Sequence, residues 1–154
     1  MISFLLFNFP KAQIFLGDSG SYLFGSLVAL NIIFTNNLNP LISSFFFCIL
    51  LFYLFFEVFF SFLRKLYQKK SPVLPDNEHL HMLSFKLLNK AFDLEKSNYI
   101  NSLIINSVFF TLVFPSIYFS GSSLACKYWF FSLIIIYLLI YIRLYHLIKK
   151  KFDI

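Results

Sequence analysis

The sequence is poor in charged residues, in glycine and in proline. Only 13% of its 154 residues are charged, whereas a soluble globular domain carries about 25%. So small a charged fraction could not cover a surface that faces water, and this excludes a soluble protein. Four glycines and five prolines also leave little room for long loops.

Cysteine is scarce as well. Cys48 lies within an apolar run and Cys126 lies in a distant loop, so we expect two buried or inert thiols rather than a disulfide. Apolar residues, by contrast, are abundant: 59% of the chain is hydrophobic, with 24 phenylalanines and 9 tyrosines. This composition excludes intrinsic disorder and predicts an integral membrane protein.

Four apolar segments approach or exceed the roughly 20 residues that a membrane-spanning helix needs. They run from about 19 to 35, 41 to 63, 99 to 119 and 128 to 147. Residues 1–9 are apolar but too short to span, and we interpret them as the end of a span that begins outside this chain. We therefore expect an all-α, polytopic membrane helix bundle, in which residues 1–154 form one domain with four full spans. This domain would be the C-terminal part of a longer protein.

The basic residues predict the orientation of these spans. Twelve of the 13 Lys and Arg residues fall on one side, in the loop 64–97, in the tail after the last span and at Lys11; only Lys127 falls on the other. The positive-inside rule places the richer side in the cytoplasm. Attraction to anionic membrane lipid accounts for the net charge of +6, so no nucleic-acid partner is expected.

Two carboxylates lie at or within the predicted spans. Asp18 precedes the first span between two glycines; it could cap that helix, hold a hard cation such as Mg²⁺ at the membrane mouth, or do both. Glu57 lies inside the second span, seven residues before Arg64, which is roughly 10 Å below the membrane boundary. An acid at that depth indicates a functional site, and the alternative is a structural pair with Arg64.

The loop after the second span carries the densest chemistry, in the segment KKSPVLPDNEHLH that ends at His81. Its prolines end the preceding helix, and Asp76 could cap a new one with an apolar stripe from Leu80 to Leu94. His79 and His81 could share a metal ion only if the backbone between them were extended. No third ligand follows at a suitable spacing, which disfavours a zinc site. Contact of these basic side chains with phosphate groups is one interpretation, and a solvated positive loop is the other.

Two segments resemble motifs of a known enzyme family. Residues 8–21 (NFPKAQIFLGDSGS) resemble an N-x-P-x-A-x-x-F-x-G-D-S-G-S motif, and residues 71–81 (SPVLPDNEHLH) resemble an S-P-x-x-P-D-x-x-H-L-H loop. Both motifs are typical of the polyprenyl-phosphate N-acetylhexosamine-1-phosphate transferases, where they occur in this order with two spans between them. The resemblance covers almost the whole chain, from Asn8 to the fourth span.

This resemblance implies a reaction at the cytoplasmic face of a bacterial cytoplasmic membrane. A UDP-N-acetylhexosamine would give its sugar-1-phosphate to undecaprenyl phosphate and release UMP. Asp18 matches the family's residue for the Mg²⁺ cofactor, and it is expected to be catalytic together with His79 and His81. The residues expected to bind substrate are Asn8, Glu57, Lys70 and Asp76.

The chain also departs from the family pattern. Relatives usually carry aspartate where Glu57 stands and often a further histidine where Met82 stands, and they carry an adjacent Asp-Asp pair that is absent here. We therefore expect one part of an enzyme, working with an N-terminal half or a second copy. A catalytically inactive four-span scaffold or partner subunit is the alternative. A small transporter is a third interpretation, which one deep acid supports poorly.

Overall fold

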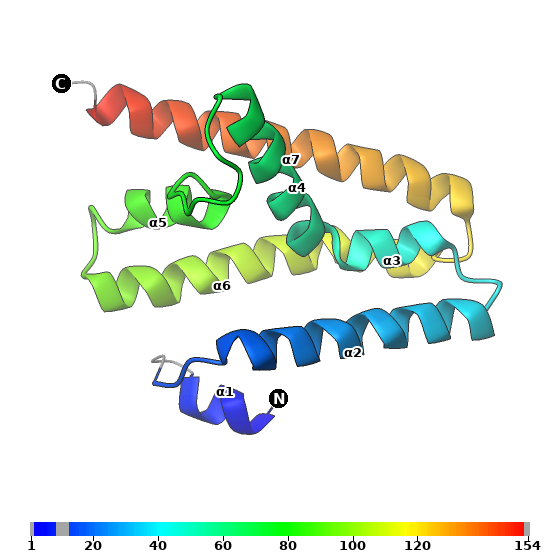
Figure 1. The fold of residues 1–154 in the computed structure, drawn as a ribbon. Helices are drawn as coiled ribbons and strands as arrows, with labels where there is room; N and C mark the ends of the chain where they lie inside the picture. Colours follow the sequence, from blue (N-terminus) through cyan, green and yellow to red (C-terminus); the bar gives the residue numbers. More distant parts are fainter. Residues whose placement is uncertain (1, 9–12, 153–154) are drawn as a thin grey trace.

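The computed structural model describes residues 2–8 and 13–152, and this part of the chain contains helices and no strand (Figure 1). The helices are α1 (Ile2–Asn8), α2 (Gly17–Leu38), α3 (Ser44–Leu50), α4 (Phe52–Tyr67), α5 (Leu80–Leu88), α6 (Leu94–Val113), the 3₁₀ helix η1 (Phe114–Phe119) and α7 (Ser123–Phe152). The prediction of an all-α fold is confirmed for the described residues.

The core lies where α3, α4 and α5 pack against the long helix α7. Phe52, Phe56 and Phe60 recur every four residues along α4 and therefore share one face of the helix. Phe56 meets Tyr137 edge-on with ring centroids 5.0 Å apart, and Phe60 meets Tyr141 in the same way at 4.7 Å. Edge-to-face contact is a geometry that aromatic rings prefer, so this aromatic seam fixes how α4 crosses α7.

The second predicted span is bent rather than straight. α3 and α4 meet at Leu51, where the chain turns by 75°, and the backbone there has φ −96° and ψ 7°. Neither glycine nor proline lies at the bend, so the usual local causes do not apply. Phe52, directly after the bend, is buried against Phe109, Phe130 and Tyr137. We attribute the bend to this packing.

The two short polar turns lie together at one end of the bundle. The Ser43 amide donates to the carbonyl of Ser120 at 2.9 Å, and the Ser43 hydroxyl lies 3.0 Å from that of Ser123. A Cβ at Gly121 would lie only 3.3 Å from the carbonyl oxygen of Leu41, so the close approach of the turns favours glycine.

The number of complete spans differs from the prediction. Within residues 2–8 and 13–152, two segments are long and apolar enough to cross a membrane, Leu94–Ile117 and Ser123–Lys150, and the bent α3–α4 pair makes a third if it counts as one span. α2 contains the first predicted span but is not among these segments, since serines, glycines and asparagines interrupt its apolar residues. The prediction of four full spans is therefore not confirmed. α1 covers part of the predicted truncated span, of which residues 1 and 9 lie outside the described residues.

The loop 64–97 contains the short helix α5, which packs against both α6 and α7. Leu80 and Leu83 of its predicted apolar stripe are buried. Ala91 and Leu94, at the end of that stripe, are exposed and lie beyond the helix. α5 is therefore shorter than predicted, and its packing places the residues before it at the end of α4.

Candidate functional site

Glu57 lies at the centre of a buried polar cluster. Its Oε1 accepts the backbone N–H of Leu80 at 2.8 Å and lies 3.1 Å from Nδ1 of His79. Its Oε2 accepts the hydroxyl of Tyr137 at 2.5 Å. A buried carboxylate is stable only with such partners, and here one carboxylate joins α4 to the loop, to α5 and to α7.

The carboxylate of Glu57 also caps α5. The N-cap position is His79, whose backbone is extended (φ −67°, ψ 151°) and whose side chain makes no cap hydrogen bond. The first amides of a helix lack partners within it, and the charge of Glu57 is favourable near this positive end of the helix dipole. The predicted cap, Asp76, instead accepts the amide of Glu78 at 2.9 Å. The prediction that Asp76 caps α5 is wrong, because another helix supplies the cap.

Arg64 joins the loop to α4 and α7. Its guanidinium donates to the carboxylates of Asp76 (2.7 Å) and Glu78 (2.8 Å) and to the hydroxyl of Tyr141 (2.9 Å). Only 8% of the Arg64 side chain is exposed. In the described part of the chain, the alternative Glu57–Arg64 pair does not form: Arg64 is bonded to the loop and Glu57 to the start of α5.

Asp76 anchors the loop rather than facing solvent freely. Partial burial opposes its ionisation, but the amide of Glu78 and the guanidinium of Arg64 outweigh this effect and lower the pKa of Asp76 to about 2. Lys65 lies 3.4 Å from the same carboxylate and donates to two backbone carbonyls of the loop. The segment SPVLPDNE is thus held by the last two turns of α4.

The structure brings His79 and His81 together. Their rings are tilted by only 17° and their centroids lie 5.6 Å apart, since the backbone at His79 is still extended. Nδ1 of His81 lies 3.4 Å from the hydroxyl of Tyr53. Burial lowers the pKa of His81, the negative charge of Glu57 opposes that change, and His79 reinforces it. The two imidazoles form what we call the histidine pair.

Lys70 and Asp18 are both exposed. Nζ of Lys70 lies 3.7 Å from Glu78, at the edge of the loop. Asp18 lies in the first turn of α2, whose N-cap is Leu16, so the prediction that Asp18 caps this helix is wrong. Among the described residues, no hydrogen bond or ion pair joins Asp18 to the histidine pair. Across the same residues, no group of three or more His, Cys, Asp or Glu side chains could hold a metal ion.

Asn8 closes the connection between α1 and α2. Its Oδ1 accepts the amides of Gln13 (2.8 Å) and Ile14 (2.9 Å). It also borders a cavity of about 290 Å³ that Phe4, Phe15 and other apolar side chains line. Its Nδ2 is buried and has no hydrogen-bond partner in the described structure. An unsatisfied buried donor costs about 1–3 kcal/mol, so a ligand acceptor at this position would stabilise the structure.

The sequence analysis missed the tyrosines of α7. Tyr137 binds the carboxylate of Glu57, and Tyr141 accepts from Arg64 and donates to the backbone carbonyl of Glu78 at 3.0 Å. A signal for them exists in the sequence. Tyr137, Tyr141 and Tyr145 recur every four residues, which places three hydroxyls on one face of an otherwise apolar span.

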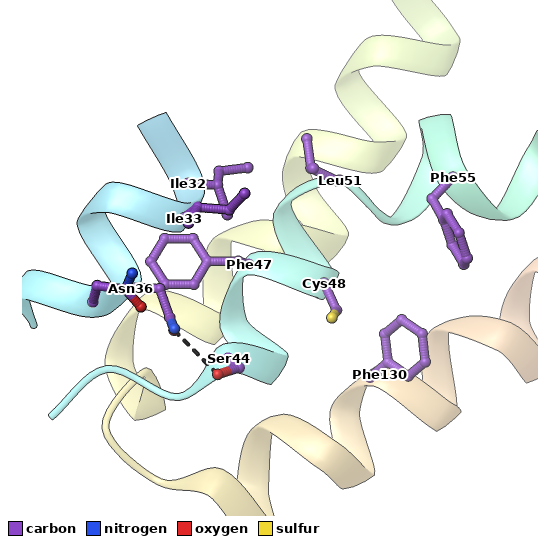
Figure 2. A pocket seen from close by; sticks show the side chains of 10 residues that line it. Ile32, Ile33, Asn36, Ser44, Phe47, Cys48, Leu51, Phe55 and Phe130 are labelled. Atoms are coloured by element: carbon purple, nitrogen blue, oxygen red, sulfur yellow. Dashed lines mark hydrogen bonds between the residues drawn. The ribbon is translucent and has the colours of Figure 1, made fainter. Parts of the chain in front are cut away.

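An apolar groove runs along the opposite side of α4. Figure 2 shows its first part, a pocket of about 380 Å³ between α2, the bend at Leu51 and Phe130 of α7. A second pocket of about 760 Å³ lies between α2 and α4 and reaches Phe62, two residues before Arg64. The two pockets share Leu51 and Phe55. We call them together the α2–α4 groove.

Two comparisons with known proteins match parts of this chain. Residues 1–36 match the model of a family described as glycosyl transferase family 4. A stretch of 92 residues is 36% identical to the undecaprenyl-phosphate alpha-N-acetylglucosaminyl 1-phosphate transferase of Thermotoga maritima. This stretch covers 58% of the present chain and 30% of that protein, so the match spans less than a third of the relative. No solved structure matches the chain.

Proposed function

We propose that this chain takes part in sugar-1-phosphate transfer, because parts of it match a glycosyl transferase family 4 model and an undecaprenyl-phosphate alpha-N-acetylglucosaminyl 1-phosphate transferase. The donor is a UDP-N-acetylhexosamine, the acceptor is undecaprenyl phosphate, and UMP is released. The reaction takes place at the cytoplasmic face of the bacterial cytoplasmic membrane. The chain contributes one part of the active site.

The observation that carries this proposal is the histidine pair at the end of a membrane helix. The ring centroids of His79 and His81 lie 5.6 Å apart, and the exposed amine of Lys70 on the same loop lies 3.7 Å from Glu78, the residue before His79. Phosphoryl transfer depends on positioning and on neutralising negative charge more than on covalent catalysis. Imidazole and ammonium groups at the depth of the lipid headgroups supply both for a diphosphate.

The α2–α4 groove supports a lipid acceptor. Its lining is almost entirely apolar and aromatic, as in sites that take up hydrocarbon. It lies on the face of α4 opposite the polar cluster and reaches Phe62, just before Arg64. A polyprenyl chain in this groove would place its phosphate at the same end of α4 as the loop.

Asp18 is the residue that would hold Mg²⁺. This ion keeps several waters and is typically bound through one or two carboxylates plus the phosphates of the substrate. One exposed carboxylate in the first turn of α2 fits that mode, with phosphate oxygens and water as the other ligands. The ion would neutralise charge on the diphosphate, and the histidine pair and Lys70 would orient it.

One observation favours the alternative, an inactive scaffold or partner subunit. α2 carries Asp18 but buries none of its side chains. In the described part of the chain, no polar contact links its first turn to the histidine pair. For the chain to act in an enzyme, a companion would be needed to hold α2 beside the loop. This companion is either an N-terminal half or a second copy.

The test is UMP release from UDP-N-acetylglucosamine by membranes that contain this chain, first alone and then together with an N-terminal half, with undecaprenyl phosphate and Mg²⁺. We expect Asp18→Asn to abolish the release. Asp93→Asn is a matched control, because its side chain is 87% exposed before α6 and should not matter. Equal activity of Asp18→Asn and wild type would refute the assigned role of Asp18. If the chain alone releases no UMP, co-expression with an N-terminal half decides between a divided enzyme and a scaffold.

A further inference from the structure

Glu57 is surrounded by hydrogen-bond donors, and these contacts bear on which nitrogen of His79 carries a proton. The amide of Leu80 and the hydroxyl of Tyr137 both donate to its carboxylate. Oε1 lies 3.1 Å from Nδ1 of His79. An ionised carboxylate only accepts hydrogen bonds, so this contact is a hydrogen bond when the ring of His79 carries its proton on Nδ1.

Among the described residues, the other nitrogen of His79 makes no such bond. Nε2 lies 3.8 Å from Oδ1 of Asp76, which is beyond hydrogen-bond distance. That same oxygen already accepts the amide of Glu78. The His79 side chain is 27% exposed, so one edge of the ring reaches solvent while the other is fixed.

We propose that Glu57 is a positioning residue: it holds His79 in the tautomer protonated at Nδ1, which leaves Nε2 as the nitrogen that meets a phosphate of the substrate. This inference rests on the proposed function for the identity of the ligand. Both oxygens of the carboxylate already accept hydrogen bonds, so this role differs from the expectation that Glu57 itself binds substrate. A proton carried by a phosphate oxygen is then donated to Nε2, which accepts this hydrogen bond while Nδ1 keeps its proton and its contact with Glu57.

Tyr137 completes this arrangement. Its hydroxyl binds Oε2 at 2.5 Å and its ring packs against Phe56 and Phe60. Rigid aromatic packing therefore fixes the carboxylate from the side of α7. Hydrogen bonds of this kind, made to the far side of a ligating or reacting histidine, set which nitrogen carries the proton.

The experiment is ¹⁵N NMR of the full chain labelled at histidine, in detergent micelles at a pH where the rings are neutral. The chain has only three histidines, and a His79→Gln sample assigns the signal. We expect wild-type His79 to be protonated mainly at Nδ1. Glu57→Gln keeps an oxygen acceptor for the cap but loses the charge, and a charge-assisted bond is roughly twice as strong as a neutral one. We therefore expect the ratio of the Nδ1–H to the Nε2–H tautomer to fall about fivefold.

Two further variants separate positioning from simple loss of structure. Tyr141→Phe removes a hydroxyl one turn further along α7 that binds Arg64 and the Glu78 carbonyl but not Glu57, and it should leave the tautomer ratio of His79 unchanged. Glu57→Asp shortens the side chain but retains the charge, and it should restore part of the ratio lost in Glu57→Gln. Wild-type His79 protonated mainly at Nε2, or a ratio unchanged in Glu57→Gln, would overturn the proposal.

Titration of the same sample with inorganic pyrophosphate tests the ligand separately. If Nε2 meets phosphate, its ¹⁵N signal should shift on addition of pyrophosphate while the Nδ1 proton is retained. A fixed tautomer with no response of Nε2 would overturn phosphate binding by His79, and with it this part of the proposed function. The positioning of His79 by Glu57 would stand in that case, so the two failures are distinguishable.

Discussion

Replacing Arg64 with methionine tests whether the polar network at the end of α4 holds the loop that carries the histidine pair. Methionine keeps much of the length and the apolar stem of arginine but cannot donate a hydrogen bond. The change removes the bonds to Asp76, Glu78 and Tyr141 together. It leaves the carboxylates of Asp76 and Glu78 without their common partner.

The size of the effect follows from the burial of the three side chains. Removing one partner of a buried ion pair costs about 3–5 kcal/mol. Arg64 is only 8% exposed, but Asp76 and Glu78 are 18% and 28% exposed, so water can reach both acids after the change. We therefore expect the lower end of the range, about 3 kcal/mol, which corresponds to a roughly 150-fold increase in the population of the open loop.

Limited proteolysis with an endoproteinase that cleaves after lysine measures this opening, because Lys69 and Lys70 lie at the start of the loop. When opening is fast relative to cleavage, the cleavage rate follows the population of the open form. Arg143→Met is the matched control, since Arg143 is exposed on α7. If the loop of Arg64→Met is cut within about twofold of the wild-type rate, the network does not hold the loop and this reasoning is wrong.

Two other changes test separate parts of the structure. The pKa of Asp76 is lowered from 3.8 to about 2, so its contribution to stability is complete above pH 3.8 and is lost as the pH falls through 2. Between pH 4 and pH 2, the wild-type loop should therefore lose about 1–2 kcal/mol of protection from cleavage by an acid-active protease. The Asp76→Asn variant should lack this step. Parallel pH profiles of the two proteins would contradict the role of Asp76 in holding the loop. Phe52→Ala should lower the free energy of unfolding by about 3–5 kcal/mol, because Phe52 is 2% exposed at the bend. Phe55→Ala, at a side chain that is 62% exposed, should cost less than about 1 kcal/mol, and equal shifts of the two variants in thermal unfolding would show that Phe52 does not fix the bend.

Sequence reasoning identified the loop as the chemically dense region and Glu57 as an unusual acid, since both stand out against an apolar chain. It assigned Glu57 two possible roles and could not decide between them. The side chain of Glu57 could contact either Arg64 or His79. Which of the two it contacts depends on where α5 begins. The apolar stripe indicates a helix from Leu80 onward, but only the burial of Leu80 in the packing of α5 against α7 brings its amide and His79 to Glu57.

The number of spans and the start of α2 were predicted less well. Hydropathy alone does not show that α3 and α4 bend at Leu51, because the bend comes from the contacts of Phe52 with two other helices. Aspartate is a residue type that often caps helices, which led to the prediction for Asp18. However, α2 begins at Gly17, which adopts a positive φ of 71°. Helix boundaries shift by a residue or two with such backbone details.

The sequence by itself determined that this protein is apolar and helical, that its polar residues are densest in one loop, and which family it resembles. Composition and motif spacing are local properties, and they suffice for these conclusions. The tertiary structure alone decided that Glu57 binds His79, that Arg64 binds Asp76 and Glu78, and that Tyr137 completes the cluster. Each of these polar groups has several partners within reach along the chain, and only the packing of α4 and α5 on α7 selects among them.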